Sequence, residues 1–201
     1  EDSLTSMYPS MVGNPQYTAI VNAQEYQRLQ EILADAAAKG ARVIAVNPRA
    51  EDFSGTRKMP VHLLLEVRDS MRVAREEIFG PLLPVIPYAT LDEAVQYVND
   101  RPRPLALYLF DYDKRNVDHV LTHTHSGGAL VNDTLVHVAI DDLPFGGIGE
   151  SGMGQYHGRE GFLALSKAKG VLYKPRFNAT RLIYPPYGRW AHRLLFKLLL
   201  R

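Results

Sequence analysis

Residues 104–133 read PLALYLFDYDKRNVDHVLTHTHSGGALVND, and this stretch decides the fold class. It opens with an unbroken apolar run, Leu105–Phe110, of the kind expected for a strand buried on both faces. A segment of helical character, Asp113–Thr124, leads to a second apolar run, Gly128–Asn132. This order predicts an α/β protein with a mostly parallel sheet and helices on both faces; an α+β domain is the alternative.

The same alternation extends toward the N-terminus. Apolar residues recur at helical spacing between Asn22 and Lys39. Asn22 is placed to cap this helix, and Glu25, three residues later, to complete a capping box. Gly40 supplies the stop signal. We therefore predict a helix over residues 22–39.

A second capping pair, Thr90 and Glu93, predicts a helix that runs to Asn99. Three apolar runs in this half predict strands, the last with prolines that suit a sheet edge: Arg42–Val46, His62–Val67 and Leu83–Tyr88.

After Gly170 the alternation of apolar runs and helical segments ends. Val171–Tyr173 has the composition of a short strand, and Tyr187–Arg201 that of a helix with most of its leucines on one side. Basic residues at every fourth position form a stripe along this helix: Arg189, Arg193, Lys197 and Arg201. We expect the helix to pack on the domain or on a partner subunit; a weak contact with a membrane surface through residues 189–201 is the alternative.

Composition excludes several classes of function. The chain has 201 residues, 46% of them hydrophobic, and a net charge of +1, which gives no reason to expect nucleic-acid binding. It contains no cysteine, so disulfides, thiolate metal sites and a cysteine nucleophile are excluded for this chain. The apolar run Leu194–Leu200 is too short for a bilayer, which takes roughly 20 residues.

The residue types of Gly147–Gly152 match the G-x-G-x-x-G pattern of dinucleotide-binding loops, but the flanking sequence does not match that of such loops. Asp141–Phe145, which precedes it, is not an apolar strand, and Lys169–Lys174 lies where the acidic partner would be expected. We interpret the segment as a tight glycine-rich turn in which backbone approaches backbone.

His119 and His123 are four residues apart, which would allow one helix face to bind a metal, with His125 and His137 nearby in sequence. No carboxylate or thiol completes the set at a recognisable spacing. We expect a solvated helix face and no metal site.

Glu76–Pro81 is an acidic pair, two apolar residues and a turn. Taken alone it predicts only a connection into the next strand, and it gains meaning from three other segments. Together the four resemble, in their order, the C-terminal part of the catalytic domain of the aldehyde dehydrogenase superfamily: Glu76–Pro81, Pro104–Tyr108, Gly127–Asp133 and Leu143–Gly154.

The resemblance covers nearly the whole chain. It is closest to the class 3 group, through segments such as Gly154–Gly158, and to coniferyl aldehyde dehydrogenases in particular, through Tyr184–Arg189 and the leucine-rich end.

The resemblance implies oxidation of an aldehyde, either coniferyl-like, otherwise aromatic or long-chain, to the carboxylic acid with NAD or NADP as cofactor. Glu77 matches the carboxylate that binds the nicotinamide ribose hydroxyls, and Phe79 the aromatic residue that packs near the nicotinamide ring. Phe145, Tyr156 and His157 match residues near the substrate channel.

The resemblance also implies that parts of the enzyme are missing here. The nucleophilic cysteine, the general-base glutamate and the cofactor-binding domain would lie upstream of Glu1, so we expect no catalytic residue in this chain and no turnover by the chain alone. Residues 1–170 are expected to form the catalytic-domain portion, and residues 171–201 an oligomerisation strand and helix of a cytoplasmic homo-oligomer. A non-catalytic oligomerisation module is the alternative.

Overall fold

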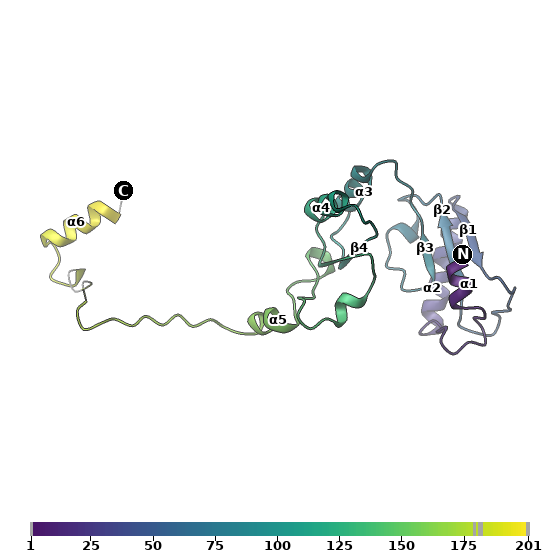
Figure 1. Ribbon diagram of the computed structural model, residues 1–201, viewed down its shortest axis with the longest axis horizontal. Coiled ribbons are helices and arrows are strands. Elements are labelled where there is room, and N and C mark those ends of the chain that lie inside the picture. Colours follow the sequence, from purple (N-terminus) through teal and green to yellow (C-terminus); the bar gives the residue numbers. More distant parts are fainter. Residues whose placement is uncertain (1, 179, 181–182, 200–201) are drawn as a thin grey trace. The chain divides into compact units, whose positions relative to one another are not determined.

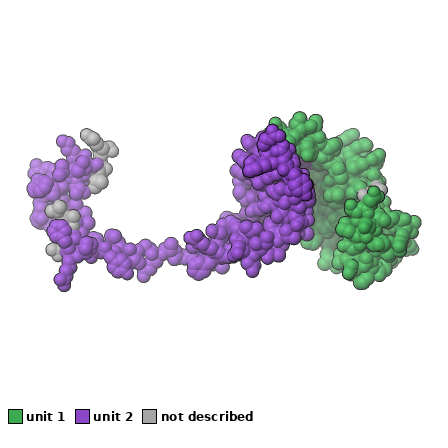
Figure 2. Space-filling model, in the orientation of Figure 1, with its two compact units in different colours: residues 1–96 green, residues 97–201 purple. Residues whose placement is uncertain are grey.

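The computed structural model describes residues 2–178, 180 and 183–199 (Figure 1). The chain divides into two compact units, one up to Gln96 and one from Tyr97 onward (Figure 2). Helix α3 (Leu91–Asn99) runs through the division. Each unit is described by itself.

The first unit is a small sheet with a long helix. After the short helix α1 (Asp2–Met7), helix α2 (Ala23–Ala38) precedes three strands in the order β1-β2-β3, which are Arg42–Val46, Val61–Leu65 and Leu82–Pro84 (Figure 1). Strand β1 is antiparallel to β2, whereas β3 is parallel to it. The predicted α2 cap is confirmed, since the Asn22 side chain accepts the Glu25 N–H at 2.8 Å.

The core of this unit lies between α2 and the sheet. Leu29, Ile32 and Ala36 of α2 are completely buried because their spacing places them on one face of the helix. They form one apolar cluster with buried residues of β2, β3 and the connecting loops: Met59, Leu64, Met71, Val73 and Leu82.

Strand β3 lies at the sheet edge, as its prolines predicted, but it is shorter than expected. It ends at Pro84, and only one further hydrogen bond, from the Val85 N–H to the Leu64 carbonyl at 2.8 Å, continues the pairing. Pro84 and Pro87 have no N–H to donate, which accounts for the early end.

The second unit contains the predicted strand, helix and strand. Strand β4 (Ala106–Leu109) pairs in parallel with β5 (Gly128–Val131), and α4 (Lys114–His123) connects them. Asp113 caps α4 through its side chain, which accepts the Arg115 N–H at 2.9 Å. Three short helices follow: η2 (Val136–Ala139), η3 (Gly149–Ser151) and α5 (Gly158–Ala164).

The α/β class is confirmed, and two of the three strand pairings among the described residues are parallel. The strands form two small sheets rather than one. The prediction that the Leu105–Phe110 run is buried on both faces was wrong for this chain, because all four residues of β4 are only half-buried. Within the described residues only β5 pairs with β4. A sheet of two strands leaves much of the side-chain surface of β4 accessible to solvent.

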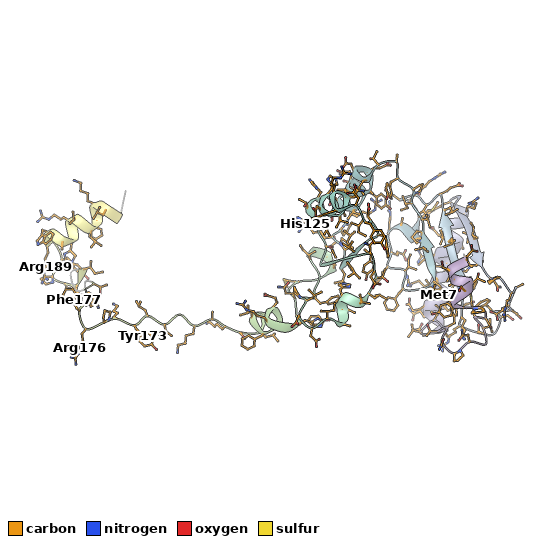
Figure 3. The ribbon with its side chains drawn as sticks, in the orientation of Figure 1. Met7, His125, Tyr173, Arg176, Phe177 and Arg189 are labelled. Atoms are coloured by element: carbon orange, nitrogen blue, oxygen red, sulfur yellow. The ribbon has the colours of Figure 1, made fainter. Side chains whose placement is uncertain are left out.

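Residues 165–178 form no helix or strand, so the strand predicted at Val171–Tyr173 is absent. A strand needs a hydrogen-bonding neighbour, and none of the described segments provides one. Tyr173 and Phe177 project from this segment with 88% and 91% of their surface exposed (Figure 3).

The C-terminal helix α6 (Trp190–Leu199) is confirmed, although it begins three residues after Tyr187. Arg201, the last member of the basic stripe, lies outside the described residues. None of the described helices has the length and apolarity needed to cross a membrane.

Candidate functional site

The segment Glu76–Pro81 connects the short helix η1 (Arg72–Ala74) to β3. Its first acidic residue, Glu76, is bound by Arg72, which donates to both carboxylate oxygens at 2.6 and 3.1 Å. This bidentate contact is the main cause that lowers the pKa of Glu76. Glu76 is therefore occupied by an intramolecular ion pair.

Glu77 and Phe79 face solvent, while Ile78 between them packs against the apolar core. No hydrogen bond or ion pair within the described residues engages the Glu77 carboxylate. The Phe79 side chain is 80% exposed. The segment thus exposes to solvent the Glu77 carboxylate, which has no partner among the described residues, and the Phe79 ring.

The backbone of this segment is under conformational strain. Phe79 has a φ of 50°, in the left-handed region that a bulky side chain rarely adopts. At the next position, a Cβ built on Gly80 would lie 2.5 Å from Cδ1 of the fully buried Leu29, so a larger residue would displace the Leu29 side chain. Packing on α2 therefore fixes the position at which Phe79 is presented.

An exposed carboxylate and an aromatic ring can together bind a sugar attached to a flat ring system. The two carboxylate oxygens of Glu77 can accept hydrogen bonds from two neighbouring hydroxyls, and two residues further on the Phe79 ring offers an apolar surface. The same ring lines a pocket of about 410 Å³ with Tyr8, Tyr17 and Pro81.

The structure brings Phe145, Tyr156 and His157 together in the second unit. Phe145 and Tyr156 exchange backbone hydrogen bonds of 2.9 and 2.8 Å as an isolated antiparallel bridge, and their ring centroids are 5.6 Å apart. The His157 ring lies 4.4 Å from that of Tyr156 and 6.1 Å from that of Phe145. The three residues predicted near the substrate channel form one aromatic cluster.

His137 belongs to the same cluster, although the sequence assigned it only to the histidine group and to the class 3 resemblance, not to the substrate channel. Its ring is 5.6 Å from that of Phe145 and 5.8 Å from that of Tyr108. It is buried, and neither of its ring nitrogens has a hydrogen-bond partner in the described structure. In sequence, His137 is surrounded by apolar residues, and nothing in that pattern indicated a contact with Phe145 or Tyr108.

The interpretation of Gly147–Gly152 as a tight turn is confirmed. A Cβ on Gly147 would lie 2.0 Å from the carbonyl oxygen of Ser151, which only a close backbone approach explains. The Ser151 hydroxyl accepts the Ile148 N–H at 2.9 Å and closes the turn.

The two histidines of α4 contact each other. The ring centroids of His119 and His123 are 4.3 Å apart, and Nδ1 of His123 lies 2.7 Å from the His119 carbonyl oxygen. Across the described parts of the chain, no three His, Cys, Asp or Glu side chains gather as metal ligands would.

The fold defines an α/β protein with an exposed acidic and aromatic segment beside its edge strand. The chain belongs to the aldehyde dehydrogenase family, whose model matches residues 3–171. It is 55% identical over its whole length to a probable coniferyl aldehyde dehydrogenase of Pseudomonas aeruginosa, and 49% identical over 98% of its length to the coniferyl aldehyde dehydrogenase of a Pseudomonas species. It spans 41% of the length of each of these relatives.

Solved structures show the same likeness. The whole chain superposes on 42% of Staphylococcus aureus AldH in a substrate-bound state, with a TM-score of 0.81 and 34% identity. It also matches an aldehyde dehydrogenase C variant of Pseudomonas syringae, in complex with NAD+ and octanal, with a TM-score of 0.66 and 30% identity over 79% of this chain and 33% of that one.

Proposed function

We propose that this chain supplies the nicotinamide-contacting segment and part of the substrate-facing wall of an NAD(P)-dependent aldehyde dehydrogenase. The single observation that carries the proposal is that a Glu77 carboxylate without a partner among the described residues lies two positions before an exposed Phe79 ring. The relatives named coniferyl aldehyde dehydrogenase favour an aromatic aldehyde of that type as substrate.

The residues present fit a nicotinamide nucleotide. Glu77 would accept hydrogen bonds from the ribose hydroxyls, and Phe79 would limit where the nicotinamide ring can lie. When bound, the cofactor supplies the hydride acceptor. The chain has no cysteine, so the thiolate that attacks the aldehyde would come from a segment outside it.

Kinetics of a full-length dehydrogenase that carries this sequence test the proposal. Glu77→Gln keeps the size of the side chain but removes its charge, and Phe79→Ala removes the ring. Both should raise the KM for the nicotinamide cofactor far more than the KM for the aldehyde. Glu66→Gln, at another exposed acid of the same unit, is the matched control. Cofactor binding unaffected by Glu77→Gln would refute the proposal.

The isolated 201-residue chain should form no NADH from coniferyl aldehyde and NAD, and calorimetry should detect at most weak binding of NAD. Turnover by pure chain would contradict this expectation.

A second candidate is an oligomerisation role for residues 171–201, with residues 1–170 as the catalytic-domain portion. It is favoured by the exposed apolar side chains Leu172, Tyr173 and Phe177, on a segment without secondary structure. An extended apolar segment of this kind can complete its hydrogen bonds at a sheet edge of another subunit. Leu172→Asp should then lower the mass measured by light scattering, and a strict monomer at high concentration before mutation would exclude the role.

A weak contact of residues 189–201 with a membrane surface, and a cytoplasmic location of the enzyme, stay predictions. Binding to anionic liposomes at low salt tests the first, because Arg189, Arg193 and Lys197 would be attracted to them.

A further inference from the structure

Arg28 of α2 contacts the candidate site across 49 residues of sequence. Its Nη1 donates to the Glu77 carbonyl at 3.0 Å, and its Nη2 donates to the Ile78 carbonyl at 2.8 Å. The third donor, Nε, binds the Glu25 carboxylate at 2.7 Å. One guanidinium therefore binds two consecutive carbonyl groups of the Glu76–Pro81 segment. The Glu25 carboxylate, on the same helix as Arg28, partly balances its positive charge.

These two carbonyls belong to the peptide units on either side of Ile78. The second unit joins Ile78 to Phe79, so the direction of the Ile78 carbonyl is coupled to the φ of Phe79. That φ is 50°, a conformation that costs free energy and persists only where its surroundings impose it. On its N-terminal side Arg28 binds the Ile78 carbonyl, and on its C-terminal side Gly80 lies close to the Leu29 side chain.

We propose that Arg28 is a positioning residue for cofactor binding. By fixing the backbone of Glu77 and Ile78, it sets the direction in which the Glu77 carboxylate and the Phe79 ring are presented. This proposal rests on the proposed function, in which those two side chains meet the nicotinamide ribose and ring. Arg28 itself makes no contact with the cofactor in this arrangement.

The chemistry of the side chain explains why arginine stands here. A planar guanidinium offers donors in fixed directions and can bind two carbonyls and a carboxylate at once, whereas an ammonium is a point charge on a flexible stem. The Arg28 side chain is 26% exposed, and its ion pair with Glu25 lies between residues three apart on α2. The two carbonyl contacts are the ones that reach the Glu76–Pro81 segment.

The experiment has two parts. In the 201-residue chain, hydrogen exchange measured by mass spectrometry compares wild type with Arg28→Ala and Arg28→Lys. Both variants should exchange faster in peptides that cover residues 76–82, while peptides of β4 and β5 are unchanged. This readout needs neither cofactor nor activity.

In a full-length dehydrogenase with this sequence, both variants should raise the KM and the calorimetric Kd for NAD about tenfold, equivalent to about 1.4 kcal/mol. The KM for the aldehyde should change much less, because the segment that Arg28 holds carries the proposed cofactor contacts. Glu25→Gln is the matched control, because it removes the ion pair with Glu25 but leaves both carbonyl contacts and the 4.0 Å ion pair of Arg28 with Glu76, so it should change the Kd for NAD much less.

The outcomes separate the two proposals. If Glu77→Gln weakens NAD binding but neither Arg28 variant does, the positioning role is refuted and the proposed function stands. If Glu77→Gln has no effect, both fail. Where Arg28→Ala does not fold, Arg28→Lys decides: unchanged exchange at residues 76–82 together with unchanged NAD affinity would overturn the role.

Discussion

The carboxylate of Glu51 accepts the backbone N–H of Met11 at 2.6 Å, and so joins two segments 40 residues apart. The same carboxylate accepts the Ser10 hydroxyl at 2.6 Å and the Val12 N–H at 3.2 Å. From the other side, Lys58 donates to the carbonyls of Met11, Val12 and Asn14 at 3.1, 2.8 and 2.7 Å. Residues 10–14 form no helix or strand. Their N–H and hydroxyl donors bind Glu51 and their carbonyl acceptors bind Lys58, so two charged side chains hold this loop in place.

The pH dependence of stability should reveal the Glu51 contact. The Ser10 hydroxyl, and after it the Met11 N–H, hold the pKa of Glu51 below its ordinary value of 4.5. Because the pKa is lower in the folded chain, the contribution is fully present above about pH 4.5 and is lost as the pH falls through the folded-state pKa. Urea unfolding of wild type and Glu51→Gln should therefore differ most at neutral pH and converge in acid.

Glu66→Gln serves as the control for this measurement, because Glu66 is exposed in the same unit. It should leave the pH dependence of unfolding unchanged. A difference between wild type and Glu51→Gln that stays constant from neutral pH to acid would contradict the assignment.

Gly80 and Leu29 should be energetically coupled. Gly80→Ala forces its Cβ against Cδ1 of Leu29, and such overpacking costs about 1–3 kcal/mol. Leu29→Ala leaves a cavity in the core and costs about 2–5 kcal/mol. In the double variant the new methyl group enters the space left by Leu29, so urea unfolding should show a loss smaller than the sum by about 0.5–3 kcal/mol. Strict additivity would mean that the two residues do not meet.

Gly147 of the glycine-rich turn should tolerate alanine much less well than Gly170, which lies outside the turn. Gly147→Ala places a methyl group on the Ser151 backbone and should lower the melting temperature or prevent folding of the second unit. Gly170→Ala is the matched control, because its Cβ would meet nothing within 4 Å. Equal melting temperatures for the two variants would refute the close backbone approach.

The cap of α2 should have a measurable and purely local effect. Asn22→Ala removes the acceptor of the Glu25 N–H and should cost about 1 kcal/mol in urea unfolding. Asn22→Asp retains an acceptor and should restore most of the loss. Full stability of the alanine variant would show that the cap is unimportant here.

The predicted helices agree well with the structure because their signals are local. The cap of α2 lies within three residues of its partner, and in α3 the Glu93 N–H donates to Thr90 Oγ1 at 3.2 Å, as the spacing predicted. The strands agree less well, since a strand depends on a neighbour. Val171–Tyr173 has the composition of a strand, but no described segment pairs with it.

The sequence by itself determined the α/β class, the capped helices and the resemblance to aldehyde dehydrogenases, because each depends on residue types at short or ordered spacing. Only the tertiary structure decided how the candidate site is held. The contacts of Arg28 with Glu77 and Ile78, and of Leu29 with Gly80, join residues about 50 positions apart, and no sequence period encodes such a pairing. They exist because α2 and β3 share one apolar core, which places the helix beside the segment that precedes the strand.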